Sequence, residues 1–395
     1  MPTEPIYYDP YDYRIDADPH PIWARMRDEA PVYYNDRFDF YALSRFSDVY
    51  AASVNHETFS SAEGTVLELI GSPLDPPPMI FMDPPRHTAF RKMVASIFTP
   101  RRMGLLEERI HELCRGYLDP FREASTFDYV GDFGARLPVM VVSSLLGIPR
   151  EDQDMVRAWT DAVLHRNEGE TGMSAEALAA FGSVHAYFQA QIEERRTRPR
   201  DDLMSDLITS ELPESTGPRR LTDGELHVFF NLISSAGNET VARLLGWTAL
   251  TLAQWPAQRA RLVENPSLIP SAVEELLRWE APSPIQARVL TRPVELHGTT
   301  LPQGAKVALL TGSAGRDPRE FADPDRFDAT REITRHVSFG YGIHFCLGAS
   351  LARIEARTAI AETLERFPEW DVDENAVEMV HTSTVRGPAR VPLIL

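Results

Sequence analysis

The sequence predicts a mainly α-helical protein with a smaller β-rich part. Through much of residues 100–280, apolar residues recur at spacings of three and four, which is the period of helices that bury one face. One apolar stretch runs from Thr222 to about Gln254, and at ~1.5 Å per residue it predicts a helix of roughly 48 Å. Strand-like patterns with Gly and Pro turns are fewer, and they lie near residues 30–60 and 284–312.

We expect the chain to form a single domain, 1–395. Its length alone would allow two or three domains of about 150 residues each. The nearest candidate for a linker, residues 211–225, lies between two helical patterns, and we interpret it as a loop. The helical core is expected over 84–280 and 347–367, and residues 370–395 are expected to add to the β-rich part.

Composition and charge exclude several classes of protein. Hydrophobic residues make up 43% of the chain and charged residues 25%, which is typical of a globular protein. The 58 Asp and Glu residues outnumber the 40 Lys and Arg residues, and this net charge of -18 argues against nucleic acid as a partner. The N-terminus lacks a signal-peptide pattern, and no run of about 18 apolar residues predicts a membrane span. The 2 cysteines fit a reducing compartment, so we expect a soluble cytoplasmic protein.

The long helix carries signals at both ends. Thr222 followed by Glu225 has the form of a capping box, and Pro256 ends the pattern after about Gln254. Because the stretch is apolar on most faces, the helix is expected in the protein interior.

The sequence AGNET, residues 236–240, interrupts the apolar pattern. A glycine in a helix interior costs ~1 kcal/mol relative to alanine, and a buried carboxylate costs more unless it has a partner. In one interpretation, Ala236 and Gly237 allow close helix packing while Glu239 reaches a surface. In the other, they widen a groove for a small ligand, beside an acid and an alcohol, Thr240, that can pass a proton. Thr240 could also bond back to a carbonyl of its own helix.

Cys346 lies in a glycine-rich loop, HVSFGYGIHFCLGASLARIEAR at residues 336–357, that leads into a helix. As a nucleophile it would need His344 as a base, but no acid that orients this histidine is evident. A structural zinc site would need about four ligands at paired spacings, and neither CxxC nor HxxxH occurs. A single thiolate ligand to haem iron fits better.

The residues around Cys346 suit a flat macrocycle. Gly340, Gly342 and Gly348 would let the backbone turn tightly and approach it closely. The helix that is expected from about Leu347 would point its positive end at the sulfur and favour the thiolate.

FGYGIHFCLGASLAR resembles the haem-binding loop of the cytochrome P450 family, whose pattern is F-G-x-G-x-H-x-C-x-G. The fixed positions are filled by Phe339, Gly340, Gly342, His344, Cys346 and Gly348. AGNET is similar to the oxygen-binding motif of the family. Glu275 and Arg278 resemble its E-x-x-R pair, and Arg326 in DPDRF resembles the arginine that completes this buried network.

The resemblance implies a haem b held by the Cys346 thiolate, with dioxygen as co-substrate. It implies the cytochrome P450 fold, a triangular helical prism with a long central helix over the haem. By the same resemblance, Ala236 and Gly237 form the oxygen-binding groove, and Thr240 and Glu239 are catalytic. The residues expected to bind the cofactor are His87, Arg91, Arg288, Phe339, Gly340, His344 and Gly348.

The function implied is that of a bacterial-type haem-thiolate monooxygenase, most often a hydroxylase of apolar small molecules. Alternatives are a haem-based ligand-binding or sensor protein and a peroxide-driven hydroxylase. Apolar residues near 60–82, 163–182, 282–287 and 381–386, at positions of variable loops over the haem, are consistent with an apolar substrate.

The electron donors implied are a ferredoxin and its ferredoxin reductase, and we expect the protein itself to be a monomer. An acidic ferredoxin would dock on a basic face on the cysteine side of the haem. The residues expected on this face are Arg91, Lys92, Arg101, Arg102, Arg335, Arg353 and Arg357.

Overall fold

The computed structural model describes residues 5–395 apart from 73, 96–97, 99–102, 105, 166–172, 214–216 and 383. Helices dominate the described chain, and short strands gather into small sheets, which confirms the predicted fold class. The α-helices are α1 (Tyr13–Ala17), α2 (His20–Glu29), α3 (Phe46–Val54), α4 (Arg86–Ala95), α6 (Glu107–Leu118), α7 (Arg136–Leu146), α8 (Gln153–Leu164), α9 (Ala175–Thr197), α10 (Leu203–Thr209), α11 (Asp223–Gln254), α12 (Pro256–Glu264), α13 (Ile269–Trp279), α14 (Thr311–Ala314) and α15 (Ala349–Arg366).

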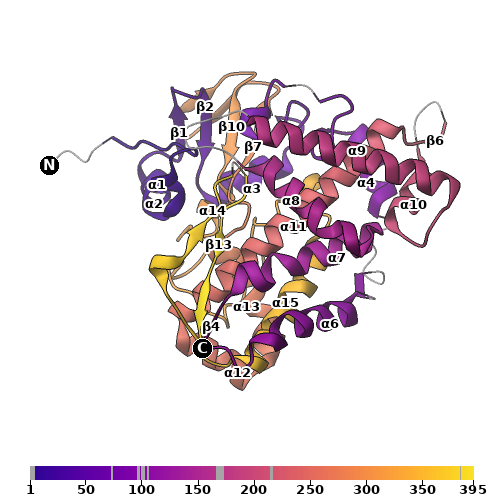
Figure 1. Ribbon diagram of the computed structural model, residues 1–395. Helices are drawn as coiled ribbons and strands as arrows, with labels where there is room; N and C mark the ends of the chain where they lie inside the picture. The colour runs from indigo at the N-terminus through magenta and orange to yellow at the C-terminus, as the bar shows by residue number, and fades with distance from the viewer. Residues whose placement is uncertain are drawn as a thin grey trace.

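The strands are short, and all of those in the largest sheet come from residues 32–60 and 286–309. They are β1 (Val32–Asn35), β2 (Phe40–Leu43), β3 (Phe59–Ser60), β4 (Thr126–Asp128), β5 (Glu211–Leu212), β6 (Arg219–Arg220), β7 (Gln286–Leu290), β8 (Val294–Leu296), β9 (Thr299–Leu301), β10 (Lys306–Leu309), β11 (Asp371–Val372), β12 (Glu378–Met379), β13 (Pro388–Arg390) and β14 (Pro392–Ile394). In Figure 1 the largest sheet stands at the upper left, beside α1 and α2, and the long helices fill the right and lower parts.

α11 is the long central helix that the sequence predicts. The Glu225 amide donates to the Thr222 hydroxyl at 3.2 Å, and the Thr222 amide donates to the Glu225 carboxylate at 2.9 Å, so the capping box forms. The helix ends at Gln254, directly before Trp255 and Pro256. α7, α8, α9, α13 and α15 pack around it, and Figure 1 shows it passing through the middle of the helical part.

The five-stranded sheet has the order β1-β2-β10-β7-β3, in which β10 runs parallel to β2 and the other neighbours are antiparallel. Because side chains alternate along a strand, each face covers its own core. Leu43 and Leu309 face a cluster with α3, whereas Phe40 and Ala308 face a cluster with α2. β7, which carries Arg288, is paired with β10 on one side and with β3 on the other.

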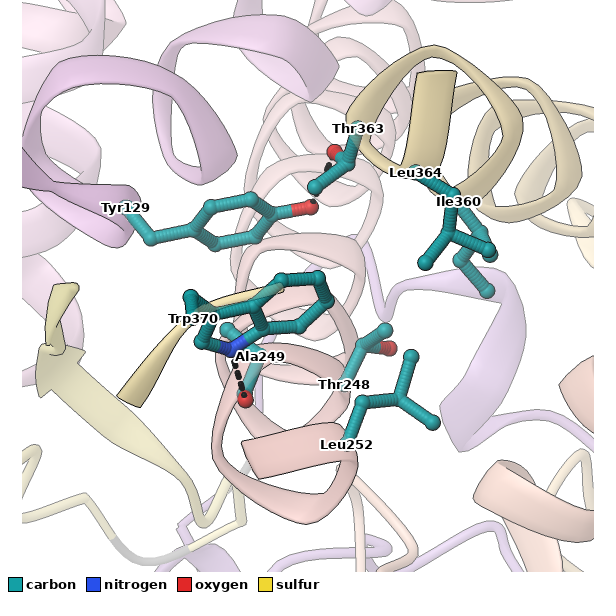
Figure 2. A pocket seen from close by; sticks show the side chains of 8 residues that line it. All are labelled: Tyr129, Thr248, Ala249, Leu252, Ile360, Thr363, Leu364 and Trp370. Atoms are coloured by element: carbon teal, nitrogen blue, oxygen red, sulfur yellow. Dashed lines mark hydrogen bonds between the residues drawn. The ribbon is translucent and has the colours of Figure 1, made fainter. Parts of the chain in front are cut away.

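The helical core is tightly packed where α11 meets α15. Figure 2 shows an interstice at this contact in which the Tyr129 hydroxyl lies 2.9 Å from the Thr363 hydroxyl, and the Trp370 indole N–H donates to the Ala249 carbonyl at 3.0 Å. The interstice has no room for a water molecule, so it serves packing rather than ligand binding. Within the described residues, no helix combines the length and the apolar character needed to span a membrane.

Candidate functional site

The loop that carries Cys346 is held by backbone turns that only glycine adopts readily. Gly340 and Gly342 have φ values of +67° and +70°. A Cβ atom on Gly342 would also lie 2.7 Å from the Ser53 carbonyl oxygen, which is too close for any side chain. Beyond these turns, the Cys346 amide donates to the Phe339 carbonyl at 2.9 Å. The loop therefore presents the cysteine in one defined position.

Gly348 lies in a tight turn, as expected, but this turn does not require glycine. The Ala349 amide donates to the Cys346 carbonyl at 3.4 Å across it, and the Gly348 φ of -84° is open to any residue. The nearest atom to a Cβ built on Gly348 is the Cys346 sulfur at 4.0 Å. The missing side chain thus keeps the space beside the sulfur open, and α15 begins just afterwards, at Ala349.

The protein alone does not stabilise the Cys346 thiolate enough to lower its pKa. Burial raises the pKa of Cys346, while the amides of Gly348 and Ala349 and the positive charges of Arg91 and Arg353 act in the opposite direction. The amides at the helix start therefore favour the thiolate, as expected, while burial acts more strongly in the opposite direction. A metal ion on the sulfur would supply the missing stabilisation, because a coordinating thiol loses its proton.

Next to Cys346 lies a cluster of basic side chains from three separate elements. α4 contributes His87 and Arg91, β7 contributes Arg288, and the loop contributes His344. The rings of His87 and His344 have centroids 4.3 Å apart. Arg288 is 3% exposed, and its guanidinium donates only to the Ala287 carbonyl at 2.7 Å and, more weakly, to the Gln286 side chain at 3.5 Å. In the described part of the chain, no ion pair joins Arg91 or Arg288 to a carboxylate.

Among the described residues, no carboxylate forms an ion pair with this basic cluster, although the charge of Asp83 acts on His87 and Arg288. Burial, followed by the charge of Arg91, lowers the pKa of His87 to about 4. Burial, followed by the charge of Arg288, lowers the pKa of His344 to about 3, and burial lowers the pKa of Arg288 to about 10. The Nε2 atoms of both histidines are buried and have no hydrogen-bond partner among the residues that the structure describes. A flat group bearing two carboxylates, as haem does in its propionates, fits these orphaned donors and the adjacent sulfur.

α11 exposes one polar face in its otherwise buried middle. Ala236 is exposed and Thr240, one turn later, is half-buried, and the Thr240 hydroxyl donates to the Ala236 carbonyl at 2.9 Å as anticipated. Gly237 does not share this face: a Cβ atom there would lie 2.7 Å from Cγ2 of Val142 on α7. Gly237 therefore allows close packing of α11 on α7, which is the alternative that the sequence left open for this glycine. Its assignment to an oxygen-binding groove stays a prediction.

Glu239 is buried rather than directed to a surface. It is 7% exposed, and one of its oxygens lies 3.4 Å from Nε of Arg243, one turn later. Its carboxyl is also hydrogen-bonded to that of Asp161 on α8. Loss of hydration, followed by the charge of Glu239, raises the pKa of Asp161 to about 7. Asp161 was not anticipated from sequence, because it lies in an ordinary amphipathic helix and belongs to no motif.

The buried Glu-Arg-Arg network forms with a different second arginine. Glu275 and Arg278 are both fully buried, and the guanidinium of Arg278 donates to Glu275 at 2.6 and 2.8 Å. The second arginine is Arg331, whose Nε donates to Glu275 at 3.1 Å. Arg326 is exposed, and it meets this network through its backbone, since the Arg326 carbonyl accepts from Arg331 at 2.9 Å. The prediction for Arg326 is wrong because the adjacent Phe327, which is 0% exposed, occupies the interior.

The expected basic face on the cysteine side is smaller than predicted. Arg335 pairs with Glu320 at 2.8 Å, and Arg353 pairs with Glu274 at 2.6 Å. Arg91 belongs to the basic cluster described above. Arg101 and Arg102 lie outside the described residues, as do 73, 166–172 and 383 in the predicted substrate loops. The cations that remain are Lys92, which is exposed, and Arg357, for which no ion pair occurs in the described chain.

Comparisons with known proteins agree with this geometry. Residues 171–391 match the model of the family described as Cytochrome P450. The putative cytochrome P450 123 of Mycobacterium tuberculosis is 41% identical over 392 residues, which cover 98% of this chain and 96% of the relative. The vitamin D(3) 25-hydroxylase of Pseudonocardia autotrophica is 38% identical over 386 residues, which cover 96% of this chain and 94% of the relative. The structure of CYP109E1 from Bacillus megaterium in complex with testosterone has a TM-score of 0.87 at 31% identity, with 96% of this chain and 98% of that chain covered.

Proposed function

The chain belongs to the cytochrome P450 family of haem-thiolate monooxygenases, and on that premise we propose that it hydroxylates an apolar small molecule with electrons from a redox partner. The family uses haem b with a cysteine thiolate ligand, and dioxygen is its co-substrate. The observation that carries the proposal is the pairing of a buried acid, Glu239, with an accessible alcohol, Thr240, on the central helix. A protein that only binds a ligand has no need of such a pair.

In this proposal, Cys346 holds the iron through its sulfur. His87, Arg91, Arg288 and His344 hold the two propionates, whose charge pairs with the unpartnered basic cluster. Phe339, Gly340 and Gly348 shape the loop against the face of the macrocycle. When bound, haem with a thiolate ligand supplies the reductive activation of dioxygen.

The remaining chemistry falls to α11. The Thr240 hydroxyl donates a hydrogen bond to the Ala236 carbonyl, so its lone pairs stay available to accept a hydrogen bond from a neighbouring acid. Glu239, which directly precedes Thr240, is the adjacent acid. Its burial keeps bulk water away from the path of the proton. Together they would deliver protons one at a time to the oxygen-binding side of the site.

The names of two similar proteins support an apolar substrate. One relative is named a vitamin D(3) 25-hydroxylase, and one structural neighbour was solved with testosterone. We infer that this chain takes an apolar molecule of similar size. A screen that starts from vitamin D(3) and testosterone and follows the spin-state shift of the haem would identify a ligand.

Replacing Thr240 with alanine is expected to uncouple reductant consumption from product formation. Without the hydroxyl, protons from Glu239 lose their acceptor, and the fraction of reductant recovered as product should fall at least about tenfold. The measurement is product formed per NAD(P)H consumed, with a substrate found in the screen. Thr248→Ala is the matched control, because the Thr248 hydroxyl also donates one turn back, to the Leu244 carbonyl at 2.8 Å, but is buried away from the site. Equal coupling in the two variants would remove the role assigned to Thr240.

We propose further that a ferredoxin docks beside Cys346. Phe345, the residue before the cysteine, is 37% exposed, and Lys92 and Arg357 supply positive charge that no carboxylate of the described chain neutralises. An acidic partner would be attracted to this surface and its association would weaken with salt.

Charge reversal at both positions, Lys92→Glu with Arg357→Glu, should slow reduction by an acidic ferredoxin about tenfold at low salt, and the wild-type rate should fall as salt rises. Stopped-flow reduction of the haem measures this rate. Arg198→Glu, an exposed position just after α9, serves as the control and should keep the wild-type rate. A wild-type rate that does not depend on salt would count against docking on this surface.

A further inference from the structure

α8 brings a second carboxylic acid to the acid of the central helix. α8 packs against α11, and the carboxyl groups of Asp161 and Glu239 are hydrogen-bonded to each other. Two carboxylates cannot share a hydrogen bond unless one of them carries a proton. The pair therefore holds one proton between two sites and behaves as a coupled unit.

Each carboxyl group of this pair also has an arginine beside it. Arg157 on α8 has its Nε 3.7 Å from Asp161, and Arg243 on α11 has its Nε 3.4 Å from Glu239. The ionisable groups that act on Asp161 are these two arginines, which lower its pKa, and Glu239, which raises it. The arginines favour the ionised form of Asp161, whereas the charge of Glu239 favours the protonated form, so Asp161 can both take up and release a proton near neutral pH.

Exposure to solvent falls along the pair. The Asp161 side chain is 44% exposed, whereas the Glu239 side chain is 9% exposed. Thr240 directly follows Glu239 in α11. A proton taken up from water at Asp161 thus has one hydrogen bond to cross before it reaches the buried acid.

We propose that Asp161 is the solvent-side half of a two-carboxyl relay that recharges Glu239 with protons. The inference rests on the proposed function and adds a residue outside the family motifs. After Glu239 has released the proton of the pair toward Thr240, the Asp161 carboxylate takes a proton from hydronium, and the protonated Asp161 then gives that proton to the Glu239 carboxylate. Each step breaks one O–H bond and forms another, and no group is oxidised or reduced. Asp161 acts through Glu239 and is therefore a positioning residue rather than a catalytic one.

Infrared spectroscopy of the holoenzyme tests the shared proton without turnover. The wild type should show a protonated-carboxyl band that is lost with a midpoint near pH 7, because the pair keeps its proton up to that pH. In Asp161→Asn this component should disappear, because the carboxyl that carries the raised pKa is no longer present. Asp154→Asn, an exposed position on the same helix, is the control. Glu355, whose pKa burial raises to about 8, contributes equally to all three proteins and cancels in the differences.

Turnover provides the second measurement. Asp161→Asn should lower product formed per reductant consumed about tenfold at pH 7, whereas Asp154→Asn should match the wild type. Because the two acids act in series, Asp161→Asn added to Glu239→Gln should cause little further loss. If Asp161→Asn showed the same infrared titration and the same product formed per reductant as the wild type, the relay would be overturned. The proposed function would remain intact. Absence of product in the wild type and in Asp154→Asn would instead overturn the proposed function.

Discussion

Replacing Cys346 with serine should abolish product formation while leaving the fold in place. The serine hydroxyl keeps its proton far above neutral pH. It therefore cannot replace the anionic sulfur that would donate electron density to the iron. The loop itself should survive, because its turns depend on Gly340 and Gly342 and on the bond from the amide of residue 346 to Phe339. The measurements are product formation with a screened substrate, haem content and the far-ultraviolet circular dichroism spectrum.

Cys114 provides the matched control for this variant. It is the other cysteine of the chain, it is fully buried in the helical core on α6, and burial raises the pKa of its thiol. Cys114→Ser should retain product formation per haem. A Cys346→Ser variant that turns over like Cys114→Ser would show that the thiolate is not required.

Replacing Glu275 with alanine should destabilise the protein by about 3–5 kcal/mol or prevent folding. The change leaves Arg278, which is 0% exposed, and Arg331 without the carboxylate that pairs with both. Breaking a buried ion pair by removing one partner costs this much because an uncompensated charge remains inside the protein. Arg278 also donates to the carbonyls of Gly315 and Pro324, so the loss should loosen the segment that leads to the cysteine loop.

Denaturant unfolding of the holoenzyme measures this difference in free energy. Glu274→Ala is the control, because Glu274 lies next in sequence and also binds two basic side chains, His336 and Arg353, but on a partly exposed face. Its loss should cost about 1 kcal/mol or less. Equal free energies of unfolding for the two variants would contradict the role given to the buried network.

Features fixed by local sequence could be predicted well. The capping box at Thr222 and Glu225 and the positive φ values at Gly340 and Gly342 depend on neighbours within a few residues. The loop around Cys346 was therefore identifiable as a ligand-binding turn before any geometry was known. The choice of haem over zinc followed from the absence of further paired ligands in the sequence.

Features that depend on packing between distant elements could not be predicted. Gly237 meets Val142 across a helix contact, and Asp161 meets Glu239 across another, so neither partner is marked in the sequence. Arg331 replaces Arg326 because the direction of side chains in an irregular loop follows from which residue, here Phe327, fills the interior. The pKa of the Cys346 thiol likewise reflects burial by the whole fold rather than the adjacent helix start alone.

The absorption spectrum of the reduced wild-type holoenzyme under carbon monoxide tests the central claim most directly, because the position of the Soret band reports which protein group would bind the iron. Ligation by the Cys346 thiolate predicts the long-wavelength Soret band that is typical of haem-thiolate proteins. A Soret band only at the shorter wavelength of histidine-ligated or neutral-ligand haem would contradict the assignment of Cys346 as the iron ligand.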